Sequence, residues 1–341
     1  MAESAQPLAD LAAIYEHVVQ RVVGRRQEIK LILAAIAKQK PILLLGLPGV
    51  SKTTILKEIA RALSNDRIPQ LFSATGDEQL TAFALTGSFD PALVLQDGYK
   101  EHYFIPGPLA QAMRAGGILY IEELNRAPSG VLNVLITALS DGYIDVPRLG
   151  RIVAQPGFTV VGASNPLDDV GTGRLSHGLL DRFIVLELIY QSRDEECEIV
   201  RQRTDDQREG LIAYAVDIAR DSRSHPDLRH GASVRGAIDF VQLLEGYTTE
   251  ELTRETLHFL GCSAYGSKVQ VKPTVQRTSC AIIAEIMDGL LARDFGGQVE
   301  QLLKIQAPWG EQKKKTSLAE HATSETSRRA ASAAESQPEP R

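Results

Sequence analysis

Apolar residues near the start of the chain recur at the spacing of a helix that ends at a glycine. These residues are Leu8, Leu11, Ile14, Val18 and Val22. Positions three and four apart share one face of a helix, so the pattern predicts a helix over 8–23 with Gly24 as its stop. A second helix is predicted over 27–38, and the apolar run after it predicts a buried strand over 41–45.

Short strand-like runs alternate with helical patterns from this strand to about residue 190. The runs cover 117–121, 158–163 and 184–188. Such alternation predicts a parallel sheet covered by helices. Residues 143–158, YIDVPRLGRIVAQPGF, contain two more extended segments around a Pro-Arg-Leu-Gly turn, which predicts a projecting β-hairpin.

Helical patterns replace the strand patterns in the remainder of the chain. They cover 194–220, 232–245, 249–260 and 278–292. We therefore expect an α/β domain over 1–190 and a smaller α-helical domain over 191–308. Residues 309–341 are rich in Ser, Ala and Glu, and they cannot bury enough apolar surface to offset the entropy of ordering, so we expect a disordered tail.

Composition excludes several classes of protein. The formal net charge of the 341 residues is -6, which argues against bulk nucleic acid or an anionic membrane as the main partner. Cys197, Cys262 and Cys280 are widely spaced and odd in number, so we expect reduced thiols in the core. No apolar run reaches the length of a membrane span, and the first residues lack the pattern of a secretion signal. We expect a cytoplasmic location.

The strand at 41–45 leads into a candidate phosphate-binding loop. The sequence GLPGVSKTT matches the pattern G-x-x-x-x-G-K-S/T everywhere except at Ser51. Backbone N–H groups in such a loop point at phosphate oxygens, and the following helix N-terminus adds a partial positive charge. We expect Lys52 to reach the β and γ phosphates and the Thr53 hydroxyl to ligate Mg2+. The residues predicted to bind nucleotide in this segment are Gly46, Pro48, Gly49, Val50, Ser51, Lys52, Thr53 and Thr54.

Ser51 stands where the pattern has its second glycine. Serine is small, but unlike glycine it resists left-handed backbone angles. We therefore expect the loop to use angles that an ordinary residue accepts at this position. A plain strand-turn-helix joint is the alternative interpretation of the whole segment.

An acidic pair follows the strand predicted at 117–121. Glu122 and Glu123 stand at the carboxyl end of that strand, where open parallel sheets bind ligands. We expect Glu122 to hold Mg2+ and Glu123 to orient the attacking water. Glu122 is one methylene longer than the commoner aspartate, which puts the Mg2+ affinity in question. By itself, such a pair is most often a solvated strand end.

These motifs resemble the AAA+ ATPases, and within them the MoxR type, which is related to the ATPase subunit of magnesium chelatase. The resemblance covers about residues 8–300 and follows the order of the family's motifs. The matching segments are VVGRRQEI (22–29), GLPGVSKTT (46–54), YFIPGPLAQAM (103–113), ILYIEELNRAP (118–128), GASNP (162–166), LLDRF (179–183) and GASVRGA (231–237). The resemblance implies a P-loop AAA+ parallel-sheet sandwich, an α/β fold, with a second, smaller α-helical lid domain.

The resemblance also implies roles for residues outside the phosphate loop. Val23 and Gly24 would lie in the segment that contacts the adenine, and Asn165 would be the sensor 1 residue. Arg182 is at the arginine-finger position, and an arginine there would stabilise the γ-phosphate bound by the neighbouring subunit of a ring. Arg235 is at the sensor 2 position of the lid. A surface salt bridge is the ordinary alternative for Arg182.

Two inserts have counterparts in the family. Residues 85–108 correspond to the helix-2 insert and 143–158 to the pre-sensor-1 hairpin, which line the face where such rings meet partners. A packed hairpin with a purely structural role is the alternative. Arg126, beside the acidic pair, is a candidate for a second interface arginine.

Three functions share this set of motifs. The first is an ATP-hydrolysing, hexameric chaperone ring that remodels, activates or inserts a cofactor into a client protein, with a von Willebrand A domain protein as partner. The second is a nucleotide-gated binding module with slow hydrolysis, which the departures at Ser51 and Glu122 suggest. The third is the motor of a metal chelatase. ATP and Mg2+ are the expected cofactors, and a nucleic-acid partner is not expected because no base-reading element is evident.

Overall fold

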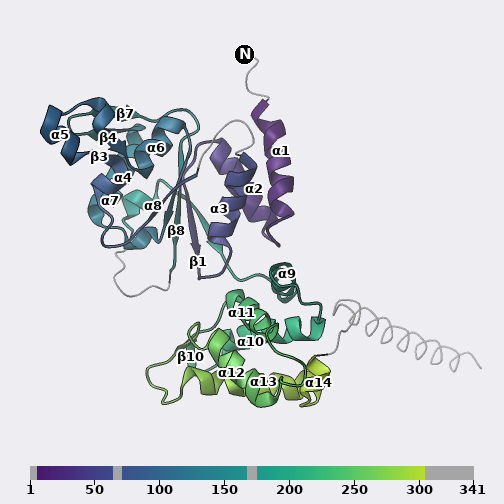
Figure 1. Ribbon diagram of the computed structural model, residues 1–341. Helices are drawn as coiled ribbons and strands as arrows, with labels where there is room; N and C mark the ends of the chain where they lie inside the picture. Colours follow the sequence, from purple (N-terminus) through teal and green to yellow (C-terminus); the bar gives the residue numbers. More distant parts are fainter. Residues whose placement is uncertain (1–5, 64–70, 167–174, 304–341) are drawn as a thin grey trace, which may run out of the picture. The chain divides into compact units, whose positions relative to one another are not determined.

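The computed structural model describes residues 6–63, 71–166 and 175–303 (Figure 1). The chain divides into two compact units, with the boundary between Gln191 and Ser192. The tail predicted at 309–341 lies outside the described residues. No helix in the described ranges is long and apolar enough to cross a membrane.

A five-stranded sheet forms the centre of the first unit. Its strands are β1 (Ile42–Gly46), β2 (Leu71–Thr75), β5 (Ile118–Glu122), β8 (Thr159–Ser164) and β9 (Ile184–Leu188). They lie in the order β2-β5-β8-β1-β9, and every pair is parallel. All five carboxyl ends therefore meet at one edge of the sheet, and the expected α/β fold with a parallel sheet is confirmed.

Helices cover both faces of this sheet (Figure 1). Leu44 faces the core formed with α1 (Gln6–Val19), α2 (Arg26–Ala37) and α3 (Lys52–Leu63). Leu43, one residue earlier, faces the opposite core, because successive side chains of a strand point to opposite faces. The helices on that second face are α4 (Ala82–Thr86), α6 (Pro108–Ala115), α7 (Ser129–Asp141) and α8 (His177–Leu180).

Both inserts are ordered antiparallel ribbons. The predicted hairpin is confirmed as β6 (Tyr143–Val146) paired with β7 (Gly150–Val153). In the other insert, β3 (Gly87–Phe89) pairs with β4 (Phe104–Pro106). The segment between β3 and β4 contains α5 (Pro91–Asp97) and the short helix η1 (Glu101–Tyr103).

The second unit is a helical bundle with one small pair of strands. Its elements are α9 (Arg193–Arg203), α10 (Glu209–Ser224), α11 (Val234–Leu244), α12 (Arg254–Tyr265), α13 (Ser279–Phe295), α14 (Val299–Leu302), and the antiparallel strands β10 (Leu228–His230) and β11 (Gln270–Val271). Tyr265 and Phe240 are fully buried in its core. The prediction of a single helix over 194–220 is wrong, because α9 and α10 are separate helices.

The break in that predicted helix has a local cause. Thr204 leaves the helical conformation at the end of α9, with φ of -130° and ψ of 157°. The Asp206 carboxylate then accepts a hydrogen bond from the backbone N–H of Arg208 at 2.7 Å and pairs with the Arg208 guanidinium. Short polar side chains that bond to nearby backbone compete with helix formation, so α10 starts as a separate helix.

The expectation of three reduced thiols is wrong for two of them. Cys262 of α12 and Cys280 of α13 form a disulfide, with their Cα atoms 4.8 Å apart. The 18 residues between them give no sign of the pairing, which arises because α12 and α13 pack together. Cys197 is a free, buried cysteine, and burial raises the pKa of its thiol to about 12.

Candidate nucleotide-binding site

The segment after β1 forms a tight loop at the carboxyl edge of the sheet. A Cβ at Gly46 would lie 2.6 Å from the carbonyl oxygen of Leu188 on the neighbouring strand, so only glycine fits there. Gly49 has φ of 83°, and α3 begins at Lys52. The first N–H groups of a helix have no partner within the helix. Those of α3 therefore give the loop a set of donors suited to an anion.

Ser51 adopts a left-handed backbone conformation with φ of 73°. The expectation that the loop would use ordinary angles at this position is wrong. The carbonyl of Ser51 accepts the first hydrogen bond of the following helix, from the N–H of Ile55 at 3.0 Å. The loop thus keeps the backbone shape of a glycine while placing a hydroxyl at this position, and its surroundings must compensate for the unfavourable angle.

Lys52 lies over the loop and not out in solvent. Its ammonium donates hydrogen bonds to the carbonyl oxygens of Gly46 and of Leu47, the latter at 3.1 Å. These contacts put a positive charge beside the N–H groups at the start of α3. A negatively charged ligand in the loop would contact both the Lys52 ammonium and these N–H groups.

Thr53, Tyr120 and Glu122 form a cluster beside the loop. The Thr53 hydroxyl donates a hydrogen bond to the Glu122 carboxylate. The Tyr120 hydroxyl lies 3.2 Å from the Thr53 hydroxyl and donates to the same Glu122 oxygen at 3.3 Å. Burial raises the pKa of the Tyr120 hydroxyl well above its ordinary value, so the group stays protonated and can donate.

The sequence reasoning missed Tyr120. Its signal was its place two residues before Glu122 in a strand, because such positions share one face of a sheet. An apolar residue would have served the core equally well at this position. The hydroxyl instead supplies a polar partner for the acidic side chain.

The cluster has the chemistry of an Mg2+ site. Hydroxyl and carboxylate oxygens suit this ion, which keeps several waters and shares ligands with a bound phosphate. Glu122 reaches the Thr53 hydroxyl directly, so its extra methylene does not separate the two groups. Glu122 is the one acidic side chain of this cluster, and the described ranges contain no group of three or more His, Cys, Asp or Glu side chains that could hold a metal ion.

Glu123 leaves the strand in a left-handed conformation with φ of 51°. Its half-exposed carboxylate forms an ion pair with Arg126 at 3.0 Å. A Cβ at Gly76, which follows β2, would lie 2.5 Å from the Glu123 carbonyl oxygen. The backbone of Glu123 is therefore tightly fixed while its side chain remains accessible to solvent.

The sheet brings the predicted sensor 1 residue to the same edge. Asn165 directly follows β8, which lies between β5 and β1. Its neighbours along this edge are therefore the acidic strand end and the loop. The predicted adenine segment also lies close to the loop, because the Val23 carbonyl and the Ser51 hydroxyl accept from the same Gln191 amide nitrogen. Gly24 has φ of 67°.

Arg182 lies at the opposite end of the sheet. It precedes β9, whose Ile184 pairs with Ile42 at the amino end of β1. Its exposed guanidinium donates to the Ser140 hydroxyl at 2.6 Å and to the Gly178 carbonyl. The structure therefore does not bring Arg182 together with the loop of its own chain.

Arg235 belongs to the second unit. It is exposed in the first turn of α11. Its side chain forms no hydrogen bond or ion pair with another residue in the described part of the chain.

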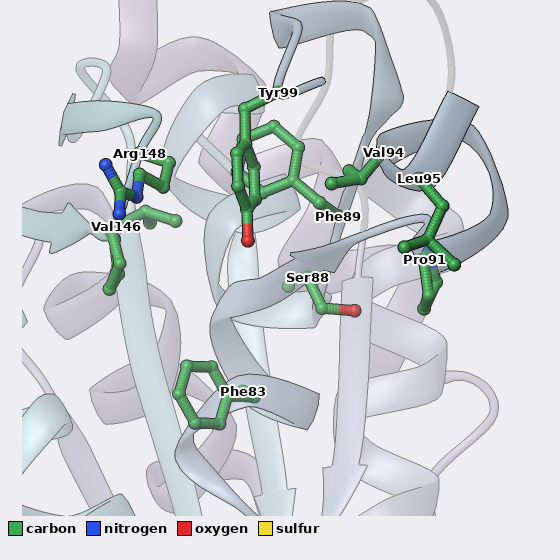
Figure 2. A pocket seen from close by; sticks show the side chains of 11 residues that line it. Phe83, Ser88, Phe89, Pro91, Val94, Leu95, Tyr99, Val146 and Arg148 are labelled. Carbon is green, nitrogen blue, oxygen red and sulfur yellow. The ribbon is translucent and has the colours of Figure 1, made fainter. Parts of the chain in front are cut away.

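The two inserts together line a surface pocket of about 440 Å³, which we call the insert pocket (Figure 2). Phe83, Leu95 and Tyr99 are 63%, 88% and 57% exposed. Arg148, in the turn of the hairpin, places its guanidinium 5.5 Å from the centre of the Tyr99 ring. The lining residues are Phe83, Gly87, Ser88, Phe89, Pro91, Val94, Leu95, Tyr99, Val146, Pro147 and Arg148.

Comparison with known proteins gives a family. Residues 41–183 match the AAA domain (dynein-related subfamily). An uncharacterised protein of Staphylococcus epidermidis is 31% identical over 229 residues, which cover 64% of this chain and 83% of that protein. The uncharacterised protein YeaC of Bacillus subtilis is 27% identical over 274 residues, covering 72% and 80%. The structure of a RuvB mutant of Thermotoga maritima is similar with a TM-score of 0.46 and 21% identity. The match covers 82% of this chain and 74% of that protein.

Proposed function

This chain belongs to the AAA+ ATPase family, with an AAA domain of the dynein-related subfamily, and from that premise we propose that it binds and hydrolyses ATP to remodel a client protein. The observation that carries the proposal is the meeting of Thr53 and Glu122 beside the loop. These residues come from different elements, and a simple structural joint would not need them together.

The residues of the site divide the chemistry among them. The N–H groups of the loop and the Lys52 ammonium bind the phosphates, and Thr53 and Glu122 hold Mg2+. Bound Mg2+ would neutralise charge on the phosphate oxygens. Glu123 orients the attacking water, and Asn165, on the next strand end, helps to hold it.

The position of Arg182 supports a ring. Its guanidinium is exposed at the end of the sheet away from its own loop, so it can serve only a loop in another subunit. A positive charge delivered there stabilises the transferring phosphate. We therefore propose a homo-oligomeric ring, with six subunits as the resemblance to MoxR-type proteins implies, and Arg235 as the residue of the second unit that responds to the γ-phosphate.

The insert pocket is the proposed contact with the client. Exposed apolar side chains that cluster on one surface commonly mark an interaction site. Phe83 of α4, and Leu95 and Tyr99 of the first insert, provide such a cluster beside the hairpin residues Val146, Pro147 and Arg148. A von Willebrand A domain protein as the partner, and a cofactor or metal as the cargo, rest on the MoxR resemblance.

One contact favours the alternative of a nucleotide-gated module with slow hydrolysis. The Glu123 carboxylate is paired with Arg126 through one oxygen, and this ion pair competes with an attacking water for the carboxylate. Hydrolysis by this chain would then be slower than with an unpaired Glu123. Arg126→Ala distinguishes the two functions, because it should increase hydrolysis if the ion pair is inhibitory and leave it unchanged if Glu123 is already available.

The proposal is tested by measuring phosphate release from ATP by the full chain, with and without Mg2+. Lys52→Ala is the control that should lose nucleotide binding, and Glu123→Gln should keep binding and lose hydrolysis. An absence of Mg2+-dependent phosphate release from the assembled wild-type protein would contradict hydrolysis. If the protein bound ATP but released no phosphate, the nucleotide-gated binding module would be the remaining function.

A further inference from the structure

Gln191, the last residue of the first unit, contacts the phosphate loop through its side chain. Its amide nitrogen donates to the Ser51 hydroxyl at 3.3 Å and to the Val23 carbonyl at 3.4 Å. An amide has two N–H donors, so one side chain can serve both acceptors. Gln191 is 6% exposed, so bulk water competes little for these two hydrogen bonds.

Arg25 holds the other end of the same amide. Its guanidinium donates to the Gln191 side-chain oxygen at 3.2 Å, to the Val50 carbonyl at 3.5 Å and to the Ile189 carbonyl. Arg25 is 7% exposed. The loop, the predicted adenine segment and the end of the first unit are thus joined by two buried side chains.

The hydrogen bond to the Ser51 hydroxyl matters because the backbone of Ser51 has an unfavourable conformation. A residue other than glycine at φ of 73° is disfavoured, and such conformations persist where the surroundings hold them. The hydrogen bond from Gln191 is the side-chain contact that holds Ser51. A glycine at the same position would need no such support.

We propose that Gln191 is a positioning residue for the phosphate loop, which it holds in the nucleotide-binding shape through the Ser51 hydroxyl. The inference rests on the proposed function, because it concerns the same ATP site.

The test is a double-mutant cycle in the full chain, with binding of a fluorescent ATP analogue as the readout. Ser51→Ala and Gln191→Ala should each weaken binding by about two- to tenfold, the usual effect of one hydrogen bond. The double variant should be little weaker than either single variant, because both remove the same interaction. The proposal is overturned if the fold-loss of binding in the double variant equals the product of the two single fold-losses. It is also overturned if Ser51→Ala binds the analogue like the wild type.

A third variant separates positioning from a general structural effect. Ser51→Gly also lacks the hydroxyl but accepts the left-handed angle, so it should bind the analogue several-fold more tightly than Ser51→Ala. Equal binding by these two variants would count against the proposal even if Gln191→Ala failed to fold. Gln111→Ala, an exposed glutamine on α6, is the matched control and should bind like the wild type.

Two failures remain distinguishable. If the wild-type chain does not bind the analogue at all, the proposed ATP site is wrong, and the role of Gln191 is wrong with it. If the wild type binds and the cycle is multiplicative, the ATP site stands and only the role of Gln191 is overturned. Melting temperatures of all variants identify any that lose binding because they unfold.

Discussion

The hydroxyl of Thr53, in the first turn of α3, donates a hydrogen bond to the carboxylate of Glu122 at the end of β5. The two residues are 69 positions apart in the chain, and the parallel sheet brings them together by placing both strand ends at one edge. The fold therefore assembles the residues proposed to bind Mg2+ beside the loop proposed to bind phosphate.

Tyr120→Phe should weaken Mg2+ binding while leaving the fold intact. The substitution removes the hydroxyl that donates to Glu122 and keeps the buried ring. We expect the Mg2+ concentration for half-maximal hydrolysis to rise by about two- to tenfold, as for the loss of one hydrogen bond. The rate at saturating Mg2+ should change little. A lower rate at every Mg2+ concentration would instead give Tyr120 a role in the chemical step.

Glu123→Gln should retain ATP and lose hydrolysis by at least about a hundredfold, because the amide cannot accept a proton from water. Its ring should hold a client that can be captured from a cell extract in ATP. Lys52→Ala, which should not hold nucleotide, is the control. Capture of the same proteins by both variants would mean that nucleotide does not control client binding.

Arg182→Ala should fold normally, since the side chain is exposed and its contacts are with Ser140 and Gly178 at the surface. We expect hydrolysis to fall by about a thousandfold, as for loss of an arginine finger. A mixture of Arg182→Ala and Lys52→Ala chains should recover activity, because an intact arginine from one chain can meet an intact loop of another. No recovery in mixed rings would argue that Arg182 does not act between subunits.

Leu95→Glu should reduce client capture without changing basal hydrolysis. Leu95 is 88% exposed and lines the insert pocket, so a charge there disturbs docking and not the core. We expect about tenfold weaker binding, as for a central contact of an interface. Phe259→Glu, at an exposed apolar residue of the second unit, is the matched control. Equal capture by both variants would place the client elsewhere.

Cys197 should resist alkylation in the folded protein at pH 8.5 and react once the chain is unfolded. Burial raises the pKa of its thiol to about 12, compared with about 8.5 in an unfolded chain. The folded state thus disfavours the thiolate, and stability is lost as pH rises above about 8.5, by at most about 1.4 kcal/mol per pH unit. Cys197→Ala should show a shallower alkaline loss. Mass spectrometry of the alkylated peptide checks the first part, and urea unfolding from pH 8 to 11 checks the second.

Local patterns in the sequence predicted the elements that place the site. The strand at 184–188 is observed over the predicted residues, and the glycine-rich loop and acidic pair lie at the expected sheet edge. These features depend on periodicity and on short motifs, which neighbouring residues determine. The parallel arrangement then follows from the alternation of strands and helices.

The features that the sequence did not reveal depend on contacts between distant residues. Tyr120 meets Thr53 across 67 positions, and Gln191 meets Ser51 across 140. The place of Tyr120 two residues before Glu122 is a weak signal, because a core residue at this position would show the same pattern. The backbone angle of Ser51 was wrongly predicted for the same reason, because its support comes from the far end of the unit.

Ser51 and Glu123 both hold backbone angles that glycine adopts without penalty. Each costs the folded chain roughly 1 kcal/mol relative to glycine, and both stand in the proposed site. A library of variants selected only for resistance to heat would therefore be enriched in glycine at these two positions. Selection for heat resistance and selection for turnover would oppose each other at Glu123, because the proposed hydrolysis needs its carboxylate and its backbone conformation is unfavourable.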